Sequence, residues 1–118
     1  MAPSRRDEFV ELMLRLNQSS ERARRELELY EAANDEVVGR VRRGEGIEQA
    51  VAAVALAFSH RQSLTETLET FEAARHDARL ALFALAAEQG SSVAELARQF
   101  GFSRQLASRL AREAMQVD

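Results

Sequence analysis

A chain of 118 residues, of which 46% are apolar and 30% charged, can build one small domain or two small modules but not a large catalytic domain. It contains no cysteine, which excludes a disulfide framework and a thiolate metal site and suits a reducing cytoplasm. Its formal net charge of −3 argues against a protein that coats nucleic acid through overall positive charge.

Helix-forming residues dominate the whole chain. Its single proline is Pro3, and Ala, Leu, Glu and Arg are abundant, so we expect an all-α fold. The longest apolar runs, 50–58 and 80–87, are far shorter than the roughly 20 residues that a bilayer-spanning helix needs. The arginines near the N-terminus are not followed by the apolar segment of a signal peptide. We therefore expect a cytoplasmic protein without a membrane partner.

The first long pattern predicts a helix over residues 5–43. Ser4, with Asp7 three residues later, has the spacing of a capping box at its start. From Phe9 to Val41 side chains recur at alternating intervals of four and three, which is the spacing of a coiled-coil seam. No apolar seam of equal length is available elsewhere in the chain, so we expect this one to join two copies. The expected dimerisation residues are Phe9, Met13, Leu16, Leu27, Tyr30, Asn34, Val37 and Val41.

Two polar stretches leave the continuity of this helix open. Asn34 occupies an a position of the heptad, where a buried asparagine fixes register and favours two strands at a cost in stability. The alternative is that residues 17–20 or 34–35 end one helix and cap the next. The glycines that follow residue 43 end the helical pattern in either case.

Two further helices are expected before the C-terminal motif. Residues 47–58 are rich in Ala and Val with almost no polar face, so this segment must be covered by a core or an interface. Ser63 opens a second capping box, which suggests a helical oligomerisation region over 1–62 and a DNA-binding region over 63–118. The stretch 79–89 is expected to be the lead-in helix of the motif.

Residues 91–112 have the pattern of a helix-turn-helix. Gly101 stands where a left-handed turn residue is needed, Phe102 fills the corner, and Ser103 suits the N-cap of the second helix. The apolar face expected on the first helix comprises Val93, Leu96, Ala97 and Phe100. The buried face expected on the second helix comprises Leu106, Ala107, Leu110 and Ala114.

The other face of the second helix carries side chains that can read base edges. Four arginines and no acid occur from Arg98 to Arg112. Arg binds guanine O6 and N7 bidentately, and Gln does the same to adenine N6 and N7, so Arg104 and Gln105 are expected to select bases. Serines and amide groups at the start of the first motif helix suit a phosphate. The expected DNA-binding residues are Ser91, Ser92, Ser103, Arg104, Gln105, Ser108, Arg109 and Arg112.

The run from Gly90 to Leu110, GSSVAELARQFGFSRQLASRL, resembles the helix-turn-helix superfamily of bacterial transcription regulators. It is also similar to the DNA-binding tails of resolvase-type and transposase-type recombinases and to the promoter-reading domains of sigma factors. The resemblance covers only the C-terminal part of the chain and implies DNA binding. It departs from many members at Leu106 and Ala107, where those have Thr followed by Val or Ile, so the phosphate contact of that Thr is missing here.

Patterns for catalysis or metal binding are weak. His76 follows Glu72 by one helical turn, and such a pair is more often a solvated surface pair than a metal site. His60 stands alone, and the sequence has no Gly-rich phosphate loop or Ser–His–Asp set. We therefore expect no enzymatic activity, no metal and no cofactor.

Together these patterns predict an all-α helical bundle with a long N-terminal helix and a C-terminal helix-turn-helix. The expected function is that of a sequence-specific transcription regulator that binds an inverted-repeat operator in double-stranded DNA as a homodimer, because one motif reads too few base pairs. One alternative is a helical protein-interaction factor that binds a sigma factor or polymerase. The other is a DNA-organising or plasmid-partition factor.

Overall fold

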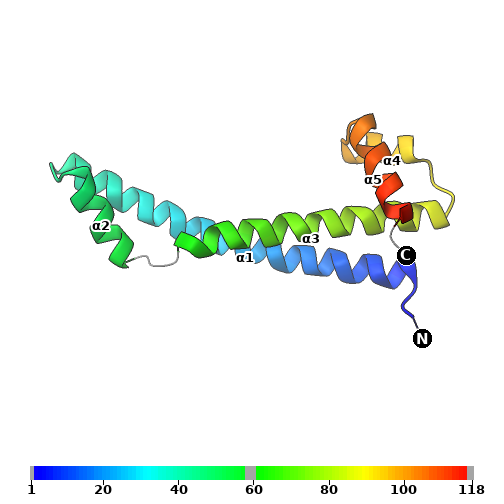
Figure 1. The fold of residues 1–118 in the computed structure, drawn as a ribbon, viewed down its shortest axis with the longest axis horizontal. Helices are drawn as coiled ribbons and strands as arrows, with labels where there is room; N and C mark the ends of the chain where they lie inside the picture. The colour runs from blue at the N-terminus through cyan, green and yellow to red at the C-terminus, as the bar shows by residue number, and fades with distance from the viewer. Residues whose placement is uncertain (1, 58–60, 117–118) are drawn as a thin grey trace. The chain divides into compact units, whose positions relative to one another are not determined.

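The computed structural model describes residues 2–57 and 61–116, and 87% of them are helical (Figure 1). This confirms the all-α fold with a long N-terminal helix. Within those residues no helix is both long and apolar enough to cross a membrane. The described residues form no strand and five helices, which are α1 (Arg5–Arg42), α2 (Ile47–Ala57), α3 (Arg61–Glu88), α4 (Val93–Phe100) and α5 (Arg104–Gln116).

Helix α1 is continuous over 38 residues. At its start the amide of Asp7 donates to Ser4 Oγ at 3.1 Å, as the capping-box spacing predicts. The helix runs through both polar stretches, 17–20 and 34–35, so neither of them is a helix break. It ends before Gly44, whose φ of 98° lies in the left-handed region.

The chain divides into two compact units. Residues 1–17 and 73–118 form one, here called the helix-turn-helix unit, and residues 18–72 form the other, the middle unit. This division differs from the expected regions 1–62 and 63–118. The physical reason is the antiparallel course of α1 and α3 in the helix-turn-helix unit, where Arg5 and Glu88 form an ion pair at 3.6 Å.

The core of the helix-turn-helix unit joins α3 to both motif helices. Phe83 of α3 is only 2% exposed and is the one aromatic residue among the buried members of this core. Three of the other four buried members are alanines, which lets the helices approach closely. The other buried members of this cluster are Ala97, Ala107, Leu110 and Ala114.

The described side chains that are buried in the middle unit are small. They are Ala23, Ala33, Ala50, Val54 and Thr67. Side chains of this size bury little apolar area, so they contribute little hydrophobic stabilisation by themselves.

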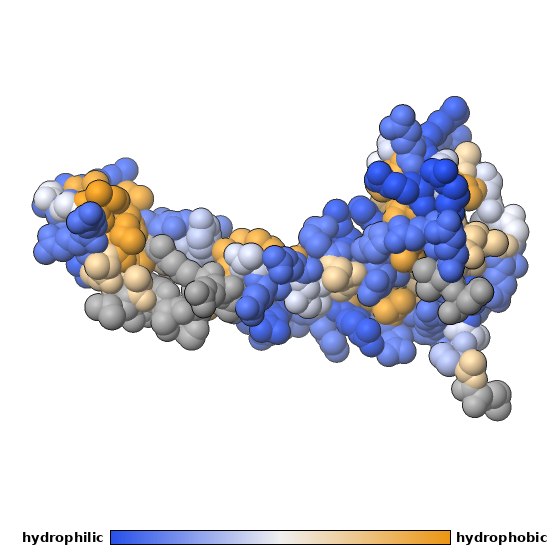
Figure 2. Space-filling model, viewed as in Figure 1, coloured by the Kyte–Doolittle hydropathy of each residue, from blue (hydrophilic) through white to orange (hydrophobic). Residues whose placement is uncertain are grey.

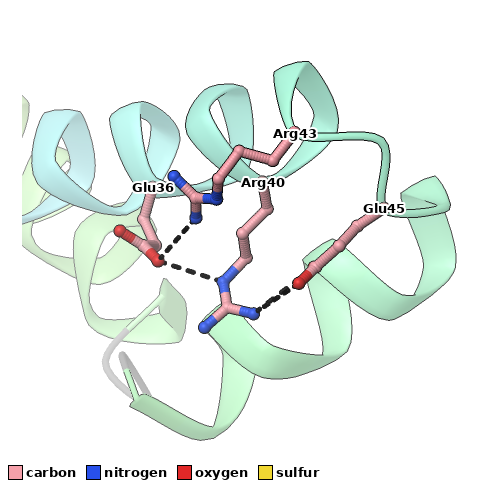
Figure 3. Close-up of polar contacts among 4 residues, drawn as sticks. All are labelled: Glu36, Arg40, Arg43 and Glu45. Atoms are coloured by element: carbon pink, nitrogen blue, oxygen red, sulfur yellow. Dashed lines mark hydrogen bonds and ion pairs between the residues drawn. The ribbon is translucent and has the colours of Figure 1, made fainter.

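A polar network closes the turn between α1 and α2. Figure 3 shows that Arg40 lies between two carboxylates, with Nε 3.0 Å from Glu36 and Nη1 3.2 Å from Glu45. Arg43 Nη2 lies 4.0 Å from the same oxygen of Glu36. The hydrogen bond and charge of Glu45, followed by those of Glu36, raise the pKa of Arg40 above its ordinary value. The network therefore holds the start of the turn through charged hydrogen bonds rather than through apolar packing.

Large apolar side chains lie on the surface of the middle unit. Ile47 at the start of α2 is 62% exposed and Val51 is also exposed, whereas Ala50 and Val54 are buried, so the described side chains of this helix are covered on one face only. Figure 2 shows this hydrophobic surface over α2 in orange. On α1, exposed apolar residues of the same unit are Leu27, Leu29, Tyr30, Val38 and Val41. Apolar surface of this kind commonly marks an interaction site.

The burial of Phe83 gives a first prediction. Phe83→Ala removes the only large aromatic side chain buried in the motif core and leaves a cavity, so it should lower the free energy of unfolding by about 3–5 kcal/mol. Phe100→Ala is the matched control, because Phe100 is 57% exposed and should lose less than about 1 kcal/mol. Chemical denaturation of both variants measures the difference. Equal losses would show that Phe83 does not support the motif.

Candidate nucleic-acid interface

The first motif helix, α4, begins at a serine cap. Ser92 has an extended backbone, with φ −75° and ψ 129°, and its Oγ accepts a hydrogen bond from the amide of Glu95 at 3.3 Å. This satisfies one of the amide groups that a helix start leaves without a partner. The carboxylate of Glu95 bonds Arg98 and Gln99 instead of returning to the cap. Ser92 is therefore part of the fold of the motif, as well as a candidate phosphate contact.

The turn between the two motif helices depends on Gly101. Its φ of 74° and ψ of 21° are left-handed, a conformation that costs other L-residues about 1–2 kcal/mol. The amides of Gly101 and Phe102 both donate to the carbonyl of Ala97, the latter at 2.8 Å. These bonds end α4 and turn the chain at once towards α5.

The second motif helix, α5, starts at the expected cap. Ser103 Oγ accepts a hydrogen bond from the amide of Leu106 at 3.1 Å. Leu106 is partly buried and packs on the motif core. The buried face is the one that the sequence predicts, with Ala107, Leu110 and Ala114 in the core.

The opposite face of α5 is exposed and carries positive charge. Arg104, Arg109 and Arg112 make no ion pair or side-chain hydrogen bond with another described residue, whereas Arg98 on α4 is bonded to Glu95. The surface over the motif is mostly hydrophilic in Figure 2. All eight residues expected to bind DNA are exposed, namely Ser91, Ser92, Ser103, Arg104, Gln105, Ser108, Arg109 and Arg112.

Two of the serines in this set already have a structural role. The hydroxyl oxygens of Ser92 and Ser103 accept the capping bonds, but each O–H proton can still be donated to a phosphate oxygen. Ser91 contributes its amide to the end of α3, where it bonds the carbonyl of Ala86 at 2.8 Å. A phosphate contact from these serines would therefore use hydroxyl protons.

Aromatic packing from α3 positions the turn of the motif. The rings of Phe83 and Phe102 have centroids 6.1 Å apart, and the guanidinium carbon of Arg79 lies 4.9 Å from the centroid of Phe102. The sequence does not single out Phe83, because Leu82 and Leu85 continue an equally regular spacing of four and three on another face of the same helix. A second face of α3 has helical spacing at Leu80, Phe83 and Ala84. That apolar face was the sequence signal that could have identified Phe83 as a buried residue.

The apolar face expected on α4 is only partly buried. Ala97 is buried and Leu96 is partly buried, but Val93 and Phe100 are exposed. The four residues have the spacing of the expected apolar face, but only the middle of that face is covered. Because α4 has just eight residues, its central turn reaches the core shared with α3 and α5 while its ends stay in solvent.

The sequence suggests Glu72 as the neighbour of His76, whereas the structure places the imidazole of His76 beside Glu113. His76 Nε2 donates to Glu113 of α5 at 2.9 Å, which ties the end of α5 to α3. The described residues hold no group of three or more possible metal ligands. His60 lies outside the described residues.

The expected dimerisation residues fall into two groups. Phe9, Met13 and Leu16 belong to the helix-turn-helix unit, where they line a groove with α3 and the motif. The members of the middle unit that are exposed are Leu27, Tyr30, Asn34 and Val41, while Val37 is partly buried. The exposed group is the part of the seam that stays accessible to solvent.

No protein-family model, no curated protein and no solved structure matches this chain. The function is therefore argued from the geometry and chemistry of its own residues.

The left-handed turn gives a second prediction. Gly101→Ala should lower the free energy of unfolding by about 1–2 kcal/mol, since alanine is strained at this φ although no atom lies within 4 Å of its Cβ. Gly39→Ala is the control, because Gly39 lies inside α1. Its new Cβ would meet Arg43 Nη1 at 3.2 Å, but the Arg43 side chain is exposed and can move away, so alanine there should stabilise by about 0.5–1 kcal/mol. Thermal unfolding of both variants measures the two signs. A Gly101→Ala protein as stable as the parent contradicts the role given to the turn.

Proposed function

We propose that this protein is a sequence-specific DNA-binding transcription regulator that acts as a homodimer. The observation that carries the proposal is the exposed face of α5, where three arginines without ion-pair partners among the described residues follow an N-capped start. A cationic helix held on a compact support is the arrangement that enters the major groove in helix-turn-helix proteins.

The roles of individual residues follow from their positions on α5. Arg104 and Gln105 stand in its first turn, which is the part that meets base edges in such motifs. Their side chains suit bidentate bonds to guanine and adenine. Arg109 and Arg112 lie farther along the same exposed face, where contacts to bases or phosphates are both within reach.

The length of the reading face supports a dimer. Eight residue steps from Arg104 to Arg112 span about 12 Å at 1.5 Å per residue, which corresponds to about three or four base pairs at 3.4 Å each. So short a site recurs too often in a genome to specify one operator. Two motifs related by a twofold axis would read an inverted repeat with half-sites roughly 34–36 Å apart, or a multiple of that distance.

The surface of the middle unit supports the same proposal. Leu27, Tyr30 and Val41 lie at a and d positions of the seam and are exposed, and Asn34 lies between them. A second copy of α1 would cover these side chains and pair the two asparagines. Dimer formation would remove apolar surface from water.

The third prediction tests the reading face. Arg104→Ala should weaken binding to the operator by about 1–3 kcal/mol and random DNA by much less, because a base contact is lost. Arg25→Ala is the matched control, because this substitution removes the same charge outside the motif. Arg25 lies in the middle unit at an f position of the heptad, opposite the seam. The operator is first selected from random duplexes, and titrations are then run on both DNAs at several salt concentrations.

Three results would decide against this proposal. Equal weakening on both DNAs would make Arg104 a phosphate contact and misplace the reading face. A similar effect of Arg25→Ala would mean that only overall charge matters. Absence of salt-dependent DNA binding by the unaltered protein would exclude the proposed function and favour a protein partner for the motif.

The fourth prediction tests the dimer surface. Leu27→Glu places a charge in the seam and should weaken self-association roughly tenfold or more, whereas Leu29→Glu should have little effect. The two leucines are 40% and 45% exposed, but Leu29 lies at a c position outside the seam. Sedimentation equilibrium over a dilution series measures both. A parent protein that is monomeric throughout, or equal effects of the two variants, would refute this dimer.

A further inference from the structure

Helix α2 carries exposed apolar side chains that the heptad seam of α1 does not include. Ile47 and Val51 stand one turn apart on α2 and are exposed, whereas Ala50 and Val54 beside them are buried. Figure 2 shows the hydrophobic surface over this helix. Val38, near the end of α1, is exposed as well. Val38, Ile47 and Val51, here called the turn patch, lie on both sides of the turn 43–46 in the middle unit.

The turn patch continues the seam of α1. Val38 stands at an e position of the heptad, and e positions flank the a positions, which Asn34 and Val41 occupy here. Only the short turn 43–46 separates the end of the seam at Val41 from Ile47. A second copy that covers the exposed part of the seam would therefore meet the turn patch next.

The area of the exposed seam shows why a stable dimer needs this addition. A standard interface covers about 800 Å² per partner, and more than half of it is apolar. Even an aromatic side chain has at most about 250 Å² to bury, so Leu27, Tyr30 and Val41, which are 40–44% exposed, together offer at most about 330 Å². The residues of the turn patch are 37–62% exposed and offer about as much again. The two surfaces together reach the apolar area of a standard interface, which the seam alone does not.

The charges at the turn do not oppose contact between two identical surfaces. In a twofold dimer the same patch of each copy takes part, so uncompensated charge would face charge of the same sign. Here Arg40 and Arg43 form ion pairs with Glu36, and Arg40 also pairs with Glu45, within one chain (Figure 3). Glu48 is the one charged residue of α2. So little net charge suits a second copy better than a strongly charged partner such as nucleic acid.

From these observations we infer that a second copy of this chain covers the turn patch, so that α1 and α2 of each copy both form the dimer interface. The inference rests on the proposed homodimer and adds α2 to it. Helix α1 supplies the seam, and Ile47 and Val51 widen the contact across the turn. Dimer formation then removes from water the apolar side chains that α2 leaves exposed.

Sedimentation equilibrium of the full chain tests the inference by charge substitution. Ile47→Glu places a charge in the interface and should weaken self-association roughly tenfold or more. Gln49→Glu is the matched control, because Gln49 is exposed and lies about 200° around α2 from Ile47, on the opposite side of the helix. It adds the same charge and should have little effect. A circular dichroism melt checks that both variants fold.

Thiol labelling locates the contact even if Ile47→Glu does not fold. The chain has no cysteine, so Val51→Cys and Gln49→Cys each carry a single thiol. Alkylation of the Val51→Cys protein should slow roughly tenfold between a dilute, monomeric sample and a concentrated, dimeric one, because the second copy covers this position. The Gln49→Cys protein should react equally fast in both samples.

The results distinguish this inference from the proposed function. A dimer that Leu27→Glu weakens but Ile47→Glu does not, or a Val51→Cys thiol that reacts equally fast in both samples, overturns the inference and leaves a dimer through α1 alone. Equal weakening by Ile47→Glu and Gln49→Glu would show a general effect of charge and also overturn it. A parent chain that is monomeric throughout refutes the proposed homodimer, and the inference with it.

Discussion

The packing of α3 against the two motif helices is the constraint on which the rest of the structure depends. Phe83 supplies the large buried side chain, and the small Ala97 and Ala107 let α4 and α5 come close to it and to each other. A helix of eight residues is not stable in water by itself, so α4 exists because this contact buries its central turn. The left-handed Gly101 makes the required change of direction between the two helices possible.

Burial also determines which side chains of α5 face outward. Ala107, Leu110 and Ala114 occupy the core, and the helical period then places Arg104, Gln105, Ser108, Arg109 and Arg112 in solvent. The support of the motif and its proposed DNA-reading face are therefore two consequences of one amphipathic pattern. The local excess of arginine matters in a chain whose net charge is −3, because under the proposed function it would direct DNA to this face rather than to the whole surface.

The middle unit shows the complementary situation. Most of its described buried residues are alanines, while larger apolar residues such as Leu27, Tyr30 and Ile47 remain exposed. These exposed side chains leave hydrophobic stabilisation unused. Association through this surface would recover it and would also supply the second motif that a specific operator requires, so the proposed dimer answers a stability problem and a specificity problem together.

The sequence by itself determined the helical class, the heptad spacing from Phe9 to Val41, the serine cap of α5, the glycine turn of the motif and the buried face of α5. These features depend on contacts between residues close in sequence, which composition, capping and periodicity report directly. Only the tertiary structure decided that residues 1–17 belong with the motif, that Phe83 is its anchor, and that Phe100 stays exposed. Those outcomes depend on which helix faces meet across long sequence separations, and one chain carries several apolar faces that satisfy the same period.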